Sequence, residues 1–234
     1  ERNLPEEEKV YKGRVVFRGD QVKDENGFYA VFTEQSASAS MMAAAKFLDA
    51  IGRFPGNVAE DSDAVKAYRQ VFLDKLEELL GAAGKEIQAE TWISLPRSRR
   101  PAHWDNIDHP VCLLKRNLYG HPLAGLIWEK FCHKELVKLG FAKVAGWECL
   151  FCHPQQKLFL SVYVDDFRMA GPQSNVTAMW KKIGAVLDLE EAVPSSGNTY
   201  LGCKQQDVSV SEDLIKEKAH LMHRLLNPKA GQTR

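Results

Sequence analysis

The chain has 234 residues, of which 44% are hydrophobic and 26% charged, with 31 Lys and Arg against 31 Asp and Glu. Disorder along the whole chain is excluded, because large apolar residues are plentiful and the net charge is zero. No run of about 18 uncharged apolar residues is present, so no membrane-spanning helix is expected. The neutral balance counts mildly against a nucleic-acid binder, although a local basic groove fits within a neutral total.

Hydrophobic periodicity predicts a mixture of short strands and amphipathic helices along the chain. Strands are expected over 11–17, 28–32, 91–95, 111–115, 158–164, 167–170 and 199–210. Helices are expected over 36–51, 64–80 and 122–139, in a segment that Ser174 caps, and in a last segment that Ser211 caps. Because the two types do not alternate regularly, the sequence favours an α+β fold over a doubly wound one.

Two adjacent aspartates join the predicted strands 158–164 and 167–170. Only Asp165 and Asp166 lie between these strands, so the segment is typical of a β-hairpin with both carboxylates at its tip. Carboxylates at the end of apolar strands are costly to bury without a positive partner. A divalent cation such as Mg²⁺, which takes oxygen ligands, is the natural partner. An ordinary Asp-rich turn is the simpler alternative.

Several blocks of the sequence resemble the reverse transcriptases of copia-type long-terminal-repeat retrotransposons. Tyr-Val-Asp-Asp at 163–166 is similar to the Tyr-X-Asp-Asp box of these enzymes. The run at 114–120, followed by Trp128, resembles "LKKSLYGLKQAPRxW". Segments 11–16, 147–151 and 200–202 resemble "YKARLV", "DxSLF" and "FLG". The blocks keep the family order from about residue 10 to 205.

The resemblance implies the α+β fold of a right-hand polymerase, whose antiparallel palm sheet packs on helices. Residues 9–56 and 91–121 would be fingers-like. Residues 57–90 and 122–210 would be palm-like and carry the catalytic hairpin, and 211–234 would begin a thumb or connecting helix. The implied activity is RNA-directed DNA polymerisation, a nucleotidyl transfer that uses two Mg²⁺ ions, or Mn²⁺, on a primer 3′-hydroxyl.

A third carboxylate is implied by the family's "DVKTAF" segment, which the stretch 63–68 matches in the offset from Asp to Ala and aromatic. By this match Asp63 and Asp165 are the main catalytic metal ligands and Asp166 is the weaker third. Asp61 and Glu60 are rival carboxylates nearby.

The resemblance also implies nucleotide and nucleic-acid contacts. Tyr68 would be a steric gate against a 2′-hydroxyl, with a core aromatic as the alternative. Lys12 and Arg14 would grip the triphosphate, and Tyr163 and Val164 of the box would complete the nucleotide site. The dense basic cluster Arg97, Arg99 and Arg100 would contact template phosphates, with an exposed loop as the alternative.

Two positions depart from the family pattern. Leu123 stands where the family has a Gln that helps to hold the incoming nucleotide, and Leu126 stands where it has an Arg. Neither Leu can make those hydrogen bonds. The alternative function is therefore a catalytically inactive retrotransposon relic that at most binds nucleic acid. A haem or zinc module on Cys149, Cys152 and His153 is a further alternative, although no second Cys-X-X-Cys pair accompanies it.

The implied partners are a primed RNA or DNA template and deoxynucleoside triphosphates. If the gene is longer, ribonuclease H and integrase domains of a Pol polyprotein join them, and no membrane partner is expected. The charged segment 1–9 predicts no secretory signal, and five cysteines without dense spacing favour reduced thiols. The expected location is intracellular, in the cytoplasm, the nucleus or a virus-like particle.

Overall fold

The computed structural model describes residues 13, 15–24, 26–30, 42–82, 84, 90–206 and 208–226, with side chains in the last helix up to 221. The chain divides into two compact units, Glu1–Ser195 and Ser196–Arg234. Within the described residues, no helix has both the length and the apolar content needed to cross a bilayer.

The first unit is built on an antiparallel sheet with six strands among its described residues. The strands run in the order β4-β5-β6-β7-β1-β8. Their bounds are β4 Ala142–Lys143, β5 Leu150–His153, β6 Leu158–Tyr163, β7 Asp166–Pro172, β1 Asn57–Asp63 and β8 Val193–Pro194. The central strand β7 pairs with β6 on one side and with β1 on the other. The predicted α+β class, with an antiparallel sheet packed on helices, is confirmed.

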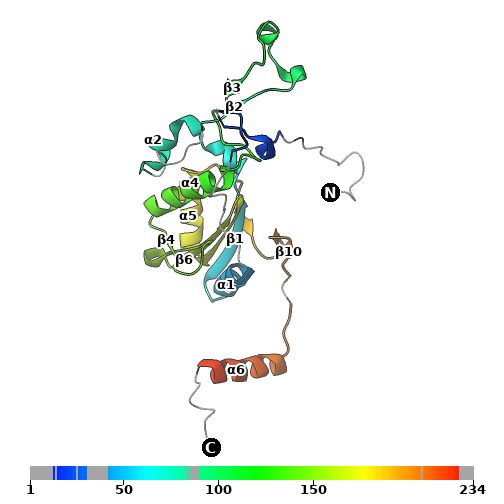
Figure 1. The fold of residues 1–234 in the computed structure, drawn as a ribbon. Coiled ribbons are helices and arrows are strands. Elements are labelled where there is room, and N and C mark those ends of the chain that lie inside the picture. Colours follow the sequence, from blue (N-terminus) through cyan, green and yellow to red (C-terminus); the bar gives the residue numbers. More distant parts are fainter. Residues whose placement is uncertain are drawn as a thin grey trace, which may run out of the picture. The chain divides into compact units, whose positions relative to one another are not determined.

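Helices cover both faces of this sheet (Figure 1). Helices α4 (Ala124–Lys138) and α5 (Gln173–Gly184) pack on one face, where Ile127 and Ile183 join Phe167 of β7 in the main core. Helix α1 (Met42–Gly52) packs on the other face, where Leu48 meets Ala170 in a second, smaller cluster. The division follows from the alternation of side chains along β7, which sends neighbouring residues to opposite faces.

The strong apolar stripe predicted for 122–139 forms α4, whose buried residues are those of the stripe within the helix together with Glu135. The helix ends at Lys138, and Gly140, two residues further on, adopts φ 96°. A Cβ at this glycine would lie 2.7 Å from Nε2 of His153, so both the backbone and the packing require glycine there.

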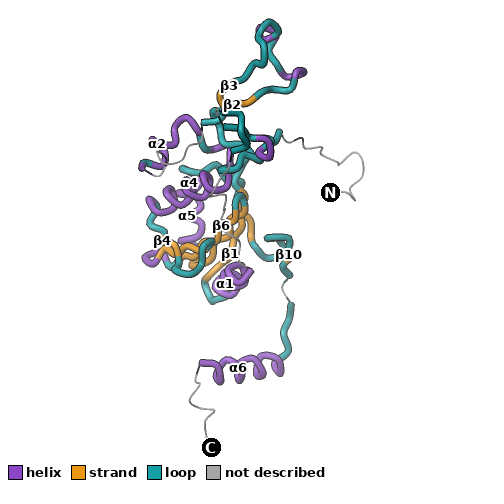
Figure 2. Tube along the Cα trace, viewed as in Figure 1, coloured by secondary structure: helices purple, strands orange, loops and turns teal. Residues whose placement is uncertain are grey.

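A small two-stranded sheet lies apart from the main sheet in the fold. Strand β2 (Trp92–Ile93) pairs antiparallel with β3 (Cys112–Leu113), at the two places where short strands are predicted. Their connection is mostly loop, with two short 3₁₀ turns, η5 (Arg97–Arg99) and η6 (Ala102–Trp104) (Figure 2).

The second unit contains two short strands and one helix among its described residues. Strands β9 (Thr199–Tyr200) and β10 (Cys203–Lys204) form a hairpin, so only part of the predicted strand 199–210 is regular. Helix α6 (Glu212–Leu226) follows. The hydroxyl of Ser211 accepts a hydrogen bond from the Leu214 amide at 3.3 Å, which confirms the predicted cap.

The helix predicted over 64–80 is wrong. Lys66 adopts a left-handed φ of 52°, and short turns η3 (Ala67–Gln70) and η4 (Leu73–Lys75) precede α2 (Leu76–Leu80). Tertiary hydrogen bonds replace the helical ones. The backbone amide of Val65 donates to the Asp188 carbonyl at 2.9 Å, and the side-chain Nε2 of Gln70 donates to the same oxygen at 2.8 Å. Local propensity yields here to long-range partners.

Three smaller predictions also differ from the structure. Ser174 does not cap α5: the helix begins at Gln173, and the Ser174 hydroxyl bonds to the Asn175 side chain at 3.3 Å. Residues 15–17 of the first predicted strand are irregular, and the rest of it, except residue 13, lies outside the described residues. In the second predicted strand, Tyr29 makes a single bridge to Lys23. Short 3₁₀ turns also occur at η2 (Gly19–Gln21) and η7 (Pro154–Gln156).

His121 is a buried titratable group at the entrance to α4. Its Nδ1 accepts a hydrogen bond from the Leu123 amide at 3.2 Å, and its Nε2 lies 3.0 Å from the Thr91 hydroxyl. Its ring centroid lies 5.4 Å from that of Phe17. Burial lowers the pKa of His121 to about 4, from 6.5. The ring is therefore neutral at pH 7, with its proton on Nε2 facing Thr91.

Acidification from pH 7.5 to 4 should lower the free energy of unfolding of the parent relative to His121→Gln. The unfolded chain takes up the His121 proton near pH 6.5 and the folded chain only near 4. The contribution is therefore intact above pH 6.5 and is lost as the pH falls to 4, by up to about 3 kcal/mol. Urea unfolding at several pH values measures the difference. Parallel pH profiles for the two proteins would contradict the assignment.

Candidate active site

The aspartate hairpin forms as the sequence predicts, with one difference in its tip. Tyr163 pairs with Asp166, so Val164 and Asp165 form a two-residue turn and Asp166 is the first residue of β7. Val164 adopts φ 54°. A β-branched residue is strained in this left-handed region, and such strain persists only where surrounding contacts enforce it.

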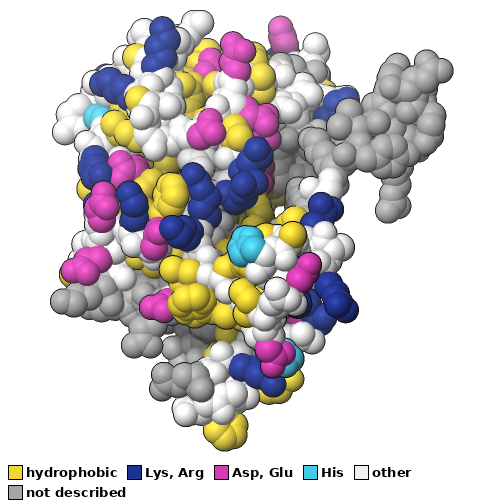
Figure 3. Space-filling model, turned by 90° about the horizontal axis from the view of Figure 1, so that it is seen from above, with side chains coloured by type: hydrophobic (Ala, Val, Ile, Leu, Met, Phe, Trp, Pro, Cys, Tyr) yellow, Lys and Arg dark blue, Asp and Glu magenta, His cyan; other side chains and the backbone are white. Residues whose placement is uncertain are grey.

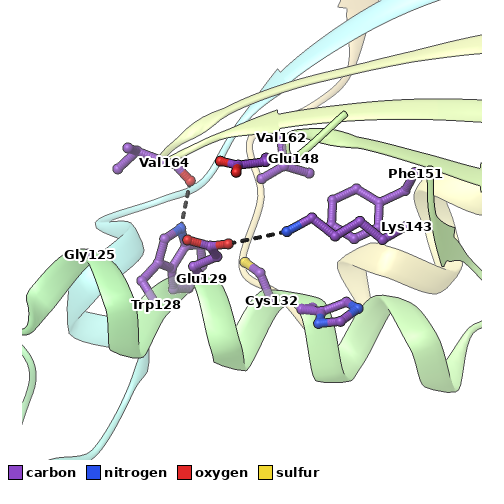
Figure 4. A pocket seen from close by; sticks show the side chains of 10 residues that line it. Gly125, Trp128, Glu129, Cys132, Lys143, Glu148, Phe151, Val162 and Val164 are labelled. Atoms are coloured by element: carbon purple, nitrogen blue, oxygen red, sulfur yellow. Dashed lines mark hydrogen bonds and ion pairs between the residues drawn. The ribbon is translucent and has the colours of Figure 1, made fainter. Parts of the chain in front are cut away.

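Two hydrogen bonds fix the carbonyl groups of this turn. The indole Nε1 of Trp128, on α4, donates to the Val164 oxygen at 2.6 Å (Figure 4). The Ala64 amide, directly after β1, donates to the Asp165 oxygen at 2.7 Å. The tip is thus tied to a helix on one side and to the end of β1 on the other, and these contacts account for the enforced conformation of Val164.

The same arrangement brings the third predicted carboxylate to the hairpin. In the antiparallel pairing of β1 with β7, Asp63 lies opposite Asp166. Directly opposed residues project to the same face of a sheet. Asp63 and Asp166 therefore share one face at the end of the sheet, beside Asp165 in the turn.

The rival carboxylates are engaged elsewhere. Asp61 is buried and accepts two hydrogen bonds from Arg168, at 2.7 and 2.9 Å. Glu60 is out of phase with Asp63 and projects to the opposite face of β1, and burial raises its pKa. The structure thus brings Asp63, and neither Asp61 nor Glu60, opposite the hairpin carboxylate.

Negative charge accumulates at this end of the sheet. The pKa of Asp166 rises to about 6, first because of burial and then because of Asp165, Asp63 and Asp61. The pKa of Asp63 also rises, through burial and then through Glu190, Asp165 and Asp61. Within the described ranges no Lys or Arg forms an ion pair with Asp63, Asp165 or Asp166.

The donor chemistry of this cluster fits a hard divalent cation. Mg²⁺ binds through one or two carboxylates and keeps water and phosphate as its other ligands, so few protein oxygens are needed. The raised pKa values of Asp63 and Asp166 indicate that a nearby positive charge would be favourable. No set of three or more His, Cys, Asp or Glu side chains in the described part of the chain is already gathered as a metal site.

A tyrosine pair lies beside the carboxylates. The rings of Tyr68 and Tyr119 are 4.5 Å apart, at an angle of 42°. The pKa of Tyr68 is raised by burial, and then by Tyr119, Asp165 and Tyr163. The sequence prediction included Tyr68 and Tyr163 and missed Tyr119. The available signal was the place of Tyr119 in the Leu-Tyr-Gly block that precedes α4.

The basic cluster belongs to the β2–β3 connection, outside the six-stranded sheet. Arg97 and Arg99 are exposed on η5. Arg100 is partly buried and supports the loop, because its Nε donates to the Leu95 carbonyl at 2.9 Å. Lys and Arg side chains also gather near the middle of one face of the molecule, with Asp and Glu among them (Figure 3). The predicted triphosphate contacts Lys12 and Arg14 lie outside the described residues.

The apolar departures from the family pattern lie in the core or against it. Leu123 is 8% exposed and belongs to the main core cluster. Leu126, on α4, and Val164 are partly buried and pack against the same cluster. The polar groups that the family places at 123 and 126 are thus replaced by packing contacts.

The haem or zinc alternative is wrong for His153. Its Nε2 lies 3.1 Å from the Leu139 carbonyl, and its Nδ1 accepts from the Gln156 amide at 3.4 Å. An accepting Nδ1 places the proton on Nε2, so neither nitrogen retains a lone pair for a metal. Cys149 is buried in the cluster around α1.

A small pocket lies between α4 and the sheet, next to the turn (Figure 4). Trp128, Val162 and Val164 form part of its lining, and an ion pair of 3.5 Å joins Lys143 to Glu129. The pocket borders the helix side of the hairpin, where Trp128 donates its hydrogen bond to Val164 of the turn.

An antiparallel sheet that ends in strand-borne carboxylates and packs on helices is the architecture of the palm of a nucleic-acid polymerase. The family model described as reverse transcriptase (RNA-dependent DNA polymerase) matches residues 81–218, more than half of the chain. The chain belongs to this family. The match contains Asp165 and Asp166 but not β1, so the tertiary structure alone brings Asp63 to them. No curated protein matches the sequence.

Among solved structures, the chain is similar to three telomerases. An apo telomerase from Candida tropicalis, truncated from its C-terminal domain, has a TM-score of 0.38 and 16% identity, covering 73% of this chain and 38% of that one. A telomerase from the same species in complex with a TWJ fragment of telomeric RNA has a TM-score of 0.37 and 13% identity, and the match covers 70% of this chain and 31% of that one. A Candida albicans telomerase in complex with the same kind of fragment has a TM-score of 0.34 and 14% identity, and the match covers 73% of this chain and 32% of that one. At these scores the likeness carries no functional argument, and this chain spans well under half of their length.

Removing the indole donor should loosen the turn. Trp128→Phe keeps the buried ring but deprives the Val164 carbonyl of its partner, at a cost of about 1 kcal/mol. Chemical unfolding measures the loss, and hydrogen exchange should quicken at residues 163–166. Trp180→Phe, on α5, is the matched control, because that indole makes no bond to the hairpin. Equal exchange in both variants would contradict the role of Trp128.

Asp166→Asn should stabilise the chain at pH 8 in the absence of divalent metal. The pKa of Asp166 in the folded chain, near 6, exceeds the ordinary value of 3.8, because the protonated carboxyl is favoured in this site. Ionisation of Asp166 therefore costs nothing below pH 3.8 and lowers the free energy of unfolding as the pH rises through 6. The side chain is half-buried and solvent screens it, so the gain is about 1 kcal/mol. Thermal unfolding in a chelator should show the gain shrinking from pH 8 to 4. The exposed Asp74→Asn should show no such trend.

Proposed function

We propose that the chain is the fingers-palm portion of an RNA-directed DNA polymerase from a copia-type retrotransposon. The observation that carries this proposal is the pairing of β1 with β7, which sets Asp63 opposite Asp166 and beside Asp165. Family membership supports the reaction class. The order of the sequence blocks from residue 10 to 205 supports the copia type.

The reaction joins a deoxynucleotide to a primer. The primer 3′-hydroxyl loses its proton to water, and its oxygen attacks the α-phosphorus and forms a new P–O bond. The P–O bond between the α- and β-phosphates breaks, and pyrophosphate leaves with the bonding electrons. Two bound Mg²⁺ or Mn²⁺ ions would lower the pKa of the 3′-hydroxyl and neutralise the leaving group. Asp63 and Asp165 are the proposed main ligands, and Asp166 is the weaker one.

The remaining site residues have proposed roles in binding. The Tyr68 ring, which packs at a tilt against Tyr119 and near Asp165, is suited to limit the space beside the sugar of the nucleotide. Tyr163 and Val164 would complete this pocket. Lys12 and Arg14 would hold the triphosphate, because guanidinium and ammonium groups match phosphate oxygens. Exposed Arg97 and Arg99 would contact template phosphates, and Arg100 would support their loop.

The proposed partners follow from this reaction. They are a primed RNA or DNA template, deoxynucleoside triphosphates and, in a longer polyprotein, ribonuclease H and integrase domains. In this assignment residues 9–56 and 91–121 form the fingers, 57–90 and 122–210 the palm, and 211–234 begins the thumb or a connecting helix. The proposed location is intracellular, in the cytoplasm, the nucleus or a virus-like particle.

A second candidate is a catalytically inactive relic that at most binds nucleic acid. Leu123 favours it, because this side chain is buried in the core where the family has a nucleotide-binding Gln. Such a chain would keep the palm fold and its carboxylates but would select nucleotides poorly.

Primer extension on RNA and DNA templates separates the two candidates. With Mg²⁺ or Mn²⁺, the parent should extend the primer, and the Asp165→Asn/Asp166→Asn variant should lose at least about a hundredfold of the rate, because metal ligands stabilise charge that forms only during transfer. Quenched-flow or gel-based extension measures both. Extension by parent and variant alike would point to a contaminating enzyme and would contradict the assignment of Asp165 and Asp166 as metal ligands.

A silent parent would favour the relic. The Leu123→Gln variant then tests the nucleotide pocket, after thermal unfolding has shown that this buried substitution leaves the chain folded. Extension restored by Leu123→Gln would locate the defect in that pocket. Continued silence on both templates would leave the inactive relic as the better description.

A further inference from the structure

A fully buried arginine lies two residues from the hairpin carboxylate. Arg168 on β7 is 0% exposed. Its Nε and Nη2 donate to the two carboxylate oxygens of Asp61, on β1, at 2.7 and 2.9 Å. This two-pronged geometry fixes both the distance and the orientation of the two side chains.

Two further segments join this ion pair. The Nη1 of Arg168 donates to Asp49, on α1, at 2.7 Å. The Ser195 hydroxyl, directly after β8, donates to the Asp61 Oδ1 at 2.7 Å, and the Ser195 amide donates to the Ala59 carbonyl at 3.0 Å. One guanidinium thereby connects β7, β1 and α1, and the segment after β8 joins them through Asp61.

The apolar pattern of β1 cannot set its own alignment. Its sequence is Asn-Val-Ala-Glu-Asp-Ser-Asp, in which only Val58 and Ala59 are apolar. Register is weakly specified in polar strands, and a slip of one residue exchanges the two faces. Such a slip would also take Asp61 away from Arg168 and leave Asp49 alone to bind the buried guanidinium, which is strongly unfavourable. The ion pair is therefore the main feature that holds β1 in register.

The site carboxylates continue the same rows. Asp63 follows Asp61 by two residues on β1, and Asp166 precedes Arg168 by two residues on β7, so all four share one face. The alignment that satisfies Arg168 is the alignment that sets Asp63 opposite Asp166. Both the offset and the face of the carboxylates follow from it.

We propose that Arg168 and Asp61 form a positioning pair, which sets the spacing of Asp63 and Asp166 for divalent metal and is supported by Asp49 and Ser195. This inference rests on the proposed function. The pair touches neither metal nor substrate and acts through the alignment of the two strands. Removing it changes the site without removing any of its ligands.

The test replaces the pair with apolar side chains of similar size, Asp61→Leu/Arg168→Met. Such replacements of buried ion pairs are often neutral or stabilising, and the carboxylate of Asp49 stays partly exposed to water, so the double variant should fold. Its Mn²⁺ dissociation constant should rise about tenfold, and amides at 62–64 and 166–168 should exchange faster. In primer extension, kcat should fall about tenfold while the nucleotide KM changes less than about twofold.

Two further variants keep the test decisive. Ser195→Ala removes one hydrogen bond to Asp61 and should weaken Mn²⁺ binding about twofold. This milder variant tests the positioning role if the double variant does not fold. Glu129→Leu/Lys143→Met removes the ion pair between α4 and β4 of the same sheet and should leave metal binding and kcat unchanged.

The outcomes separate the inference from the function it rests on. A folded double variant that binds Mn²⁺ and turns over as the parent does would overturn the positioning role. Equal losses of Mn²⁺ affinity and kcat in Asp61→Leu/Arg168→Met and in the control Glu129→Leu/Lys143→Met would overturn it as well. A parent that neither binds Mn²⁺ nor extends a primer would overturn the proposed function first, and the positioning role with it.

Discussion

The pairing of β1 with β7 is the constraint on which the candidate site depends, and a buried ion pair maintains it. β1 is mostly polar, so its place beside β7 is not secured by apolar burial alone. The two hydrogen bonds from Arg168 to Asp61 specify the register of β1 against β7, because a buried guanidinium tolerates few positions for its carboxylate partner. Through Asp49 the same charge also holds α1 against its face of the sheet. The strand ends, and with them the carboxylates, take their positions from this contact.

The charge balance around the hairpin follows from the same network. Two carboxylates, those of Asp61 and Asp49, bind the one guanidinium at 2.7–2.9 Å, so Arg168 does not neutralise the site. Asp63 and Asp166 therefore remain close to like charges, which add to the larger effect of burial in raising their pKa values. An arrangement that disfavours the metal-free folded state favours a bound cation. The hydrogen bonds to Val164 and Asp165 hold the turn in place against this repulsion.

Local pattern predicted the elements whose stability is local. The apolar stripe predicted for 122–139, the hairpin around 163–166 and the Ser211 cap each depend on residues close in sequence, and each forms. The helix predicted over 64–80 fails because Val65 and Gln70 bond to Asp188, more than a hundred residues away. Tyr119 was missed for a related reason, since only the fold brings its ring against that of Tyr68.

The sequence by itself determined the family and the hairpin, because the Tyr-Val-Asp-Asp box and its neighbouring blocks are contiguous and the match to the family model includes them. It favoured Asp63 over Glu60 and Asp61 only through the offset to Ala67 and Tyr68, because all three carboxylates lie within four residues of one another. The tertiary structure made that choice: Asp61 is bound to Arg168, Glu60 projects to the other face, and Asp63 lies opposite Asp166. The physical reason is that strand register is a long-range property, fixed here by a buried charge whose partner is 107 residues away.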